Sequence, residues 1–358
     1  MKIVYLYSSL AIMGGIERVL VNKMNYLVCH GYEVYMITPD QGQHCVPYKL
    51  DERVRFYDLQ ILSYTQYKYR GWKRLQEGKR LSQLYHQRLK EKLEEIKPDV
   101  IVCTTSQYVR ALLRMKGNIP LVVESHVNFL HPDSWHHKIR TLYNNYWIGK
   151  ADALVTLTQG DAKNWQRVSR SVHVIPNIVH LNDTGRYSDC INKRAIFVGR
   201  LVEQKGLHDI IKIWRIVNQR HPDWQLDIYG DGQMDSMPEI QLFVHPPTEN
   251  IMDEYVNSSM LLMTSVYEPF GLVLPEAMSC GLPVVAFDCP YGPVDIITDG
   301  LDGYVIRSRD VEIYANLVCR LIESRQLRLQ MGNTAVQSVQ RYSAERIMPM
   351  WKELFDSL

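Results

Sequence analysis

The chain of 358 residues lacks the features that mark membrane-spanning, metal-binding and repetitive proteins. No apolar run approaches the roughly 18 residues that a membrane span needs. The seven cysteines form no CxxC pair and no Cys/His cluster, which indicates reduced thiols in a cytosol and no metal site. Neither a low-complexity tract nor an internal repeat is present. With 46% hydrophobic and 22% charged residues, the chain suits a globular enzyme of two domains, each of roughly 150 to 200 residues.

The small net charge of +2 hides an asymmetry between the two halves of the chain. Residues 1–180 carry 25 Lys and Arg against 15 Asp and Glu, a balance of +10. Residues 181–358 carry 16 against 24, a balance of −8. A basic half joined to an acidic half predicts a different partner for each.

Part of the basic excess lies in residues 67–80, YKYRGWKRLQEGKR, where six cations alternate with two tyrosines and a tryptophan. This composition favours contact with an anionic membrane surface or a phosphate-bearing acceptor, and a plain solvated helix and loop is the alternative. Nucleic acid also binds such patches. We expect no nucleic-acid partner, however, because no helix-turn-helix, RNP or zinc-finger pattern accompanies the patch.

The hydrophobic period alternates between that of strands and that of helices along the whole chain. Residues 2–8 predict a buried first strand rather than a signal peptide, since the apolar run is interrupted by polar residues. A helix ending at Gly31 and a strand at 33–38 follow, which predicts a doubly wound parallel sheet. Further strands of this first half are predicted at 99–105, 119–126, 151–158 and 172–177.

Residues 178–194 are polar, rich in turn formers and without a sustained period, and we predict that they form the domain linker. A second Rossmann-like half follows, with strands predicted at 195–200, 224–232, 242–247, 260–266, 282–288 and 303–306. The amphipathic segment at the C-terminus contains Pro349, which predicts a kink or break in that helix.

Candidate site residues lie just after predicted strands, where ligands of doubly wound sheets bind. Gly14 and Gly15 follow the first strand and let backbone N–H groups approach a phosphate at a helix N-terminus. Arg200 and Lys205 in GRLVEQKG follow the first strand of the second half, where two cations can clamp a diphosphate. Gly230 begins the GDG turn, for which a purely geometric role is the alternative.

The most informative stretch is EPFGLVLPEAM, in which Glu268 and Glu276 stand eight positions apart. Glu268 is predicted in a loop at a strand end, and Glu276 about one turn into the following helix. A loop carboxylate can accept hydrogen bonds from sugar hydroxyls, and a helix glutamate can chelate a ribose diol. Exposed N–H groups at residues 270–272 can hold a diphosphate or further hydroxyls. One nucleotide sugar would engage all three.

These motifs, GGIER, GRLVEQKG, GDG and above all EPFGLVLPEAMSCGLPVVA, resemble those of the retaining glycosyltransferases of family 4, in the same order over nearly the whole chain. The resemblance implies an α/β GT-B fold, in which two Rossmann-like doubly wound domains face each other across a cleft. It places the acceptor-side domain at residues 1–180, the nucleotide-sugar donor domain at 181–342, and a C-terminal helix packing back on the first domain at 343–358.

The resemblance also implies roles for individual residues. Glu276 would bind the ribose hydroxyls, and Glu268 with the backbone of Phe270, Gly271 and Leu272 would hold the donor sugar. Arg200 and Lys205 would neutralise the leaving diphosphate. Gly15 would approach the distal phosphate. His126, in ESHVN, matches a position near the donor sugar.

Other implications concern the substrate and the reaction. DCPYGPVDII (288–297) resembles the variant of members that use UDP-linked sugars, with Asp295 where glutamate is usual. The resemblance implies transfer with retention, no metal or other cofactor, and a nucleotide-sugar donor. The acceptor would be a saccharide or lipid-linked saccharide of a bacterial-type surface glycan. We expect a cytoplasmic protein, peripheral at the inner face of the membrane.

Three other functions remain open on the sequence. A UDP-sugar epimerase shares the two-domain fold, but the spacing of Glu268 and Glu276 speaks against it. A Rossmann oxidoreductase is disfavoured because GGIER lacks the GxGxxG spacing. A catalytically silent nucleotide-sugar-binding partner of another transferase is the third, and the presence of Glu268, Glu276, Arg200 and Lys205 argues against it.

Overall fold

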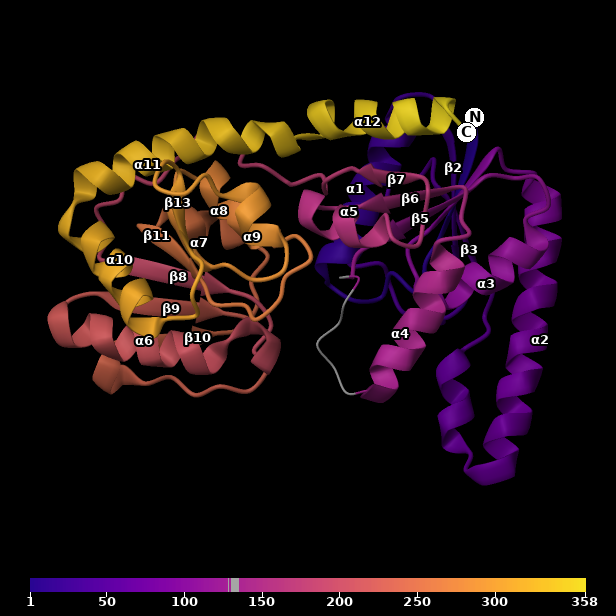
Figure 1. Cartoon of the computed structure of the whole chain (residues 1–358), viewed down its shortest axis with the longest axis horizontal. Coiled ribbons are helices and arrows are strands. Elements are labelled where there is room, and N and C mark those ends of the chain that lie inside the picture. Colours follow the sequence, from indigo (N-terminus) through magenta and orange to yellow (C-terminus); the bar gives the residue numbers. More distant parts are fainter. Residues whose placement is uncertain (128, 130–134) are drawn as a thin grey trace. The chain divides into compact units, whose positions relative to one another are not determined.

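The computed structural model describes residues 1–127, 129 and 135–358, and the chain divides into two compact units (Figure 1). Unit 1 comprises Met1–Leu157, Asp161–Ile178 and Met348–Leu358, and unit 2 comprises Thr158–Gly160 and Val179–Ile347. Each unit is built around one parallel sheet with helices between its strands. The predicted α/β fold with two Rossmann-like halves is thereby confirmed.

The sheet of unit 1 has seven strands in the order β3-β2-β1-β4-β5-β6-β7. The strands are β1 (Lys2–Leu6), β2 (Glu33–Thr38), β3 (Arg55–Asp58), β4 (Val100–Cys103), β5 (Leu121–Ser125), β6 (Ala153–Thr156) and β7 (Val172–Val174). Central strands such as β4 and β6 are buried along their whole length, because helices cover both faces of a parallel sheet. The order reverses at β1 and β4, which pair directly.

The edge strand β3 is an element that the sequence analysis missed. Its four residues, RFYD, pair only with β2 and are exposed or half-buried. An edge strand with one neighbour needs no continuous apolar run, so its sequence does not carry the signal that marks the central strands.

The helices of unit 1 begin with α1, which runs from Gly15 to Cys29 and is followed by Gly31 in a left-handed conformation (φ +84°). This is the predicted helix end, since glycine adopts that conformation without strain. The others are α2 (Gly71–Ile96), α3 (Ser106–Met115), α4 (Trp135–Ile148) and α5 (Gln159–Trp165), whose first two residues belong to unit 2, and a 3-10 helix, η1 (Ser63–Lys68), precedes α2.

The sheet of unit 2 has six strands in the order β10-β9-β8-β11-β12-β13. They are β8 (Arg194–Val198), β9 (Gln225–Tyr229), β10 (Leu242–His245), β11 (Met260–Met263), β12 (Val284–Phe287) and β13 (Gly303–Ile306). The helices are η2 (Glu203–Lys205), α6 (Leu207–Arg220), η3 (Pro238–Ile240), α7 (Ile251–Val256), α8 (Val273–Ser279), α9 (Gly292–Ile296), α10 (Val311–Glu323), α11 (Arg325–Ser338) and η4 (Val339–Tyr342). The segment between β9 and β10 contains only the short η3.

Two segments connect the units in sequence. The polar stretch 178–194 has no helix before β8, but it packs within unit 2: Asn182 N donates to Ser279 Oγ (3.0 Å) and Ser188 N donates to Cys280 O (2.8 Å). It thus holds the C-terminal end of α8. The last helix, α12 (Ala344–Asp356), continues through Pro349 rather than ending there. None of the helices in the described part of the chain is long and apolar enough to cross a membrane.

Candidate active site

Two loops at strand ends of unit 2 bring Lys205 and Glu268 together. Lys205 ends η2 after β8, and Glu268 lies in the loop after β11. The Lys205 ammonium and the Glu268 carboxylate form an ion pair, with 15% and 11% of the two side chains exposed. Ser265 Oγ also donates to the same carboxylate (3.3 Å). The structure therefore joins two residues that the sequence analysis assigned to different parts of the donor.

The backbone of Glu268 is fixed by the loop after β12. Glu268 N donates to Pro290 O (3.0 Å), and Gly292 N donates to Glu268 O (3.0 Å). An added Cβ at Gly292 would lie 2.1 Å from Phe270 O, so this contact requires glycine. The carboxylate is thus presented from two loops that brace each other, which lowers the entropy lost when a ligand binds.

The segment from Phe270 to Leu272 offers its backbone rather than its side chains. The Phe270 ring is buried and meets the Tyr342 ring edge-on at 5.4 Å between centroids. Gly271 has φ +91°, a conformation that an L-residue rarely adopts. Since Leu272 immediately precedes α8, the chain turns here from loop to helix. The use of backbone N–H groups at 270–272 toward a donor stays a prediction.

Glu276 lies in α8 and is 2% exposed. A carboxylate is seldom that buried without a partner, because removing its charge from water is costly.

The Cys289 thiol lies near the Glu268 carboxylate. Burial first, and Glu268 second, raise the pKa of Cys289 to about 12. At neutral pH that thiol is therefore protonated, and a thiol is a weaker nucleophile than a thiolate.

Arg200 and Gly230 lie at the ends of the neighbouring strands β8 and β9. Arg200 is exposed, and none of the ion pairs among the described residues involves it. Gly230 packs against the end of β8 so closely that a Cβ would lie 1.8 Å from Gly199 O. The geometric role that the sequence analysis left open for Gly230 is therefore present, whether or not a ligand also approaches it.

Asp295, which stands where the family usually has glutamate, lies in α9. Its Oδ2 accepts a hydrogen bond from Gln159 N (2.6 Å) within unit 2. The Tyr342 hydroxyl donates to the Asp295 carbonyl (3.0 Å). The shorter carboxylate thus helps to hold the start of α5 in place.

In unit 1, the glycine pair lies at the start of α1, with Gly14 as the residue before the helix. Gly14 leaves room for Glu17, whose Oε2 would lie 2.3 Å from an added Cβ. The Tyr7 hydroxyl donates to Glu17 Oε1 (2.9 Å), and burial together with Glu17 raises the pKa of Tyr7. A buried carboxylate in the first turn already complements the positive end of this helix.

His126 lies directly after β5 and is 7% exposed. Its Nε2 is 3.1 Å from Glu124 Oε1, and Lys23 of α1 forms an ion pair with the other oxygen of the same carboxylate. Burial would raise the pKa of Glu124, but Lys23 and His126 outweigh it and lower the value to about 2. An ionised Glu124 therefore links His126 to Lys23.

Comparison with known proteins identifies the family. The sequence pattern of "Glycosyl transferases group 1" matches residues 191–338, and that of "Glycosyltransferase Family 4" matches residues 13–183. This chain belongs to the family 4 glycosyltransferases.

Full-length relatives agree with this assignment. An uncharacterized glycosyltransferase of Haemophilus influenzae is 26% identical over 98% of this chain and 99% of its own length. The amylovoran biosynthesis glycosyltransferase AmsD of Erwinia amylovora is 28% identical over 99% of both chains. The crystal structure of TarM from S. aureus with UDP superposes with a TM-score of 0.81 at 16% identity and covers 99% of each chain, and so shares the fold.

Arg309, after β13, is a residue of this glycosyltransferase that the sequence analysis did not single out. Its Nη1 donates to Ser265 O (2.9 Å), its Nη2 to Thr264 O (2.6 Å) and its Nε to Asp209 Oδ2 (2.8 Å). The guanidinium also lies 4.8 Å from the centroid of the Phe287 ring. A cation just after a strand was the available signal, in the segment VIRSRD.

These contacts make Arg309 a positioning residue for the Lys205–Glu268 pair. Ser265 carries the hydroxyl that donates to Glu268. Thr264 Oγ1 donates to Lys205 O (3.0 Å). One guanidinium thus ties both loops of the candidate active site to the sheet of unit 2.

We expect Arg309→Met to lower kcat more than it weakens binding of the nucleotide. Two carbonyls lose charged hydrogen bonds, so the free energy of unfolding should fall by roughly 1–3 kcal/mol, and the Lys205–Glu268 pair should lose its alignment. Urea unfolding and steady-state kinetics measure the two effects. Arg309→Lys, which keeps the charge but not the two-carbonyl fork, should recover stability better than kcat. An unchanged kcat in a folded Arg309→Met variant would show that these contacts do not position the pair.

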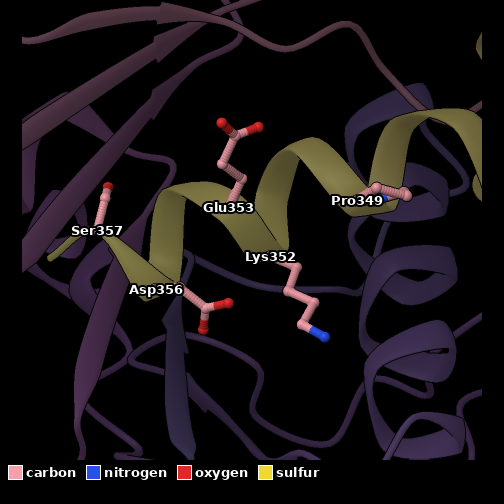
Figure 2. Close-up of a pocket in the computed structure, with 5 residues that line it drawn as sticks. All are labelled: Pro349, Lys352, Glu353, Asp356 and Ser357. Atoms are coloured by element: carbon pink, nitrogen blue, oxygen red, sulfur yellow. The ribbon is translucent and has the colours of Figure 1, made fainter.

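Two hollows of the described surface lie along the C-terminal helix. Cavities of about 370 and 620 Å³ run along α12 of the glycosyltransferase, and neither is lined by a predicted site residue. Figure 2 shows Pro349, Lys352, Glu353, Asp356 and Ser357 around the smaller one, with their side chains pointing in different directions. Within the described part of the chain, no three His, Cys, Asp or Glu side chains are arranged to hold a metal ion.

Proposed function

We propose that this glycosyltransferase moves a sugar from a UDP-linked donor to a hydroxyl of a saccharide or lipid-linked saccharide, with retention of configuration and without a metal. The observation that carries the proposal is the Lys205–Glu268 ion pair at the strand ends of unit 2, in a loop that leads through Gly271 into the helix of Glu276. Synthesis of a bacterial surface glycan, in the cytoplasm, is the setting we propose. AmsD, named for amylovoran biosynthesis, supports it.

The two cations, Lys205 and Arg200, have different roles in this proposal, because only Lys205 is paired with Glu268. Lys205 has three N–H donors and uses one on Glu268, so two remain for phosphate oxygens. The pair itself is neutral, and Arg200, which is exposed, supplies the net positive charge that attracts a diphosphate. We therefore assign Lys205 mainly to the transition state and Arg200 mainly to donor binding.

The carboxylates recognise the two sugars of the donor. Glu268 has lone pairs left for sugar hydroxyls after it accepts from Lys205 and Ser265. Glu276, buried in α8, would accept from both hydroxyls of the ribose. The roles of Gly14, Gly15 and His126 toward the donor stay predictions from the family resemblance.

The reaction would proceed by departure of UDP from the anomeric carbon, which leaves an oxocarbenium-like sugar. The bond between the anomeric carbon and the phosphate oxygen breaks, and its electron pair goes to the diphosphate, whose growing charge Lys205 stabilises. The acceptor hydroxyl attacks the same face of the sugar. Its proton passes to the departing phosphate oxygen, and attack on the face that UDP leaves retains the anomeric configuration.

A panel of nucleotides and nucleotide sugars tests the proposal. UDP should raise the unfolding temperature more than GDP or ADP, because a ligand at 100 times its dissociation constant adds about 2.7 kcal/mol of stability. With a UDP-linked α-sugar and a saccharide acceptor, NMR should show an α-linked product, at the same rate with and without EDTA. An interconverted donor sugar would indicate the epimerase, and binding without turnover the silent partner.

Two matched variants separate the carboxylates in the same assays. Glu276→Ala should weaken UDP binding about 10- to 100-fold, since hydrogen bonds to a charged group contribute about 1.5–3 kcal/mol. Glu268→Ala should bind UDP nearly as well as wild type but transfer the sugar slowly. Isothermal titration calorimetry with UDP decides, and equal losses of affinity in both variants would contradict the division of roles.

A further inference from the structure

The N-terminal part of α2 and the 3-10 helix before it form a projection that we call the α2 tip, residues 63–80. In Figure 1 this end of α2 extends away from the sheet of its own unit. Every residue from 67 to 76 is exposed, and the first buried residue of α2 is Leu81. Ten helical residues span about 15 Å at 1.5 Å each, so the helix continues about that far beyond its last contact with the core.

The α2 tip exposes large apolar side chains. Trp72 is 77% exposed, Leu75 67% and Tyr67 65%. Trp72 and Leu75 are three residues apart in the helix and so lie on the same face. Scattered apolar residues are normal on a surface, but a tryptophan that is 77% exposed beside an exposed leucine on a projecting helix end marks a contact site.

The same projection is strongly basic. It carries the cations Lys68, Arg70, Lys73, Arg74, Lys79 and Arg80 against the single acid Glu77. Glu77 is paired with Arg80 (2.6 Å), and the Arg74 guanidinium stacks 4.4 Å from the Tyr67 ring centroid, which braces η1 against α2. Among the described residues no ion pair involves Lys68 or Lys73, so their charges face solvent.

We propose that the α2 tip docks this glycosyltransferase on an anionic lipid surface, with Trp72 and Leu75 entering the headgroup layer and Lys68 and Lys73 pairing with lipid phosphates. Indole and phenol rings favour that layer because one part of each is apolar and another part is polar. The cations beside them add attraction to an anionic surface. The α2 tip lies outside the donor-binding loops, so the proposal holds or fails independently of the UDP-sugar assignment.

Vesicle sedimentation tests the docking. We expect the full-length protein to pellet with vesicles of phosphatidylglycerol and phosphatidylcholine in equal parts, but not with phosphatidylcholine alone, and to be released by high salt. Lys68→Glu with Lys73→Glu should weaken binding at least about 25-fold, since each cation contributes roughly fivefold and reversal adds repulsion. Trp72→Ala with Leu75→Ala should weaken it at least about tenfold.

Matched controls separate docking from general charge and hydrophobicity. Arg167→Glu with Arg170→Glu makes the same charge change at exposed positions of the same unit and should pellet like wild type. Ile191→Ala with Leu301→Ala removes two other exposed apolar side chains, each 59% exposed, and should also pellet like wild type. UDP-sugar hydrolysis, measured alongside, should be unchanged in all four variants.

Three results would overturn the proposal. They are a wild type that never pellets at low salt, a Lys68→Glu/Lys73→Glu variant that pellets as well as the Arg167→Glu/Arg170→Glu control, and salt-sensitive binding to a single-stranded RNA with none to vesicles. The last would assign the α2 tip to nucleic acid. A wild-type protein that pellets with the vesicles but does not hydrolyse the UDP-sugar would instead count against the donor-site assignment.

Discussion

Lys205→Met should lower kcat for sugar transfer about 100- to 1,000-fold, because the ammonium pairs with the Glu268 carboxylate and still has N–H donors for the leaving diphosphate. Removing one preorganised group that stabilises developing charge typically raises a barrier by roughly 2.7–4 kcal/mol. Here the change also leaves the Glu268 carboxylate without its cation. Its negative charge would then oppose the growing charge on the diphosphate.

Three variants show which of these two effects dominates. Lys205→Met with Glu268→Gln removes the charge opposition, so it should recover part of kcat and most of any lost stability. Arg200→Ala should raise KM for the donor with a smaller loss of kcat, because Arg200 is exposed and attracts the diphosphate from a distance. Steady-state kinetics with a UDP-sugar measures all three. A Lys205→Met enzyme with near-wild-type kcat would remove the ion pair from the mechanism.

The strand ends of unit 2 show how far the sequence can lead. Glycine, acidic and basic residues directly after apolar strands are visible in the sequence, and the parallel topology brings those strand ends to one edge of the sheet. Glu268 and Glu276 could therefore be selected without a structure. The structure places them in the elements that the sequence pattern predicts, Glu268 in the loop after β11 and Glu276 in α8.

The partners of those residues could not be predicted in the same way. Lys205 and Glu268 are 63 positions apart and meet only because β8 and β11 are neighbours in the sheet. Arg309 follows β13, two strands beyond β11 in the sheet, and contacts carbonyl groups, which leave no trace in sequence. Pairing across loops is set by strand order and by side-chain packing, and neither is encoded in the local period of the chain.

Lys23 is another residue whose environment could not be predicted from the sequence. A lysine in an amphipathic helix is usually solvated, but Lys23 is 1% exposed, pairs with Glu124 and lies 4.2 Å from the centroid of the Trp351 ring. Trp351 belongs to α12, so the ammonium connects three elements of unit 1: α1, β5 and the C-terminal helix. Its burial is a property of the assembled unit.

We expect Lys23→Met to destabilise unit 1 by about 3–5 kcal/mol, because breaking a buried ion pair leaves one charge without compensation. Methionine is apolar and similar in length to lysine, so the substitution leaves no large cavity. The loss of stability therefore measures the cost of burying the Glu124 carboxylate without its cation. Adding Glu124→Gln should restore most of the stability. Hydrogen exchange of the β1 and β5 amides in urea measures unit 1 without assuming that both units unfold together.

The loss of stability in Lys23→Met should depend on pH, and the pKa of Glu124 determines the direction. In the wild type the pKa of Glu124 is lowered to about 2, so its carboxylate contributes stability above its unfolded pKa of about 4.3, and the contribution is lost as the pH falls through about 2. Without Lys23, burial instead raises the pKa of Glu124, and protonation then favours the folded state. The deficit of Lys23→Met should therefore shrink as the pH is lowered from 7 toward 4. A deficit that is constant over this range would mean that lost packing against Trp351, and not an uncompensated carboxylate, destabilises the variant.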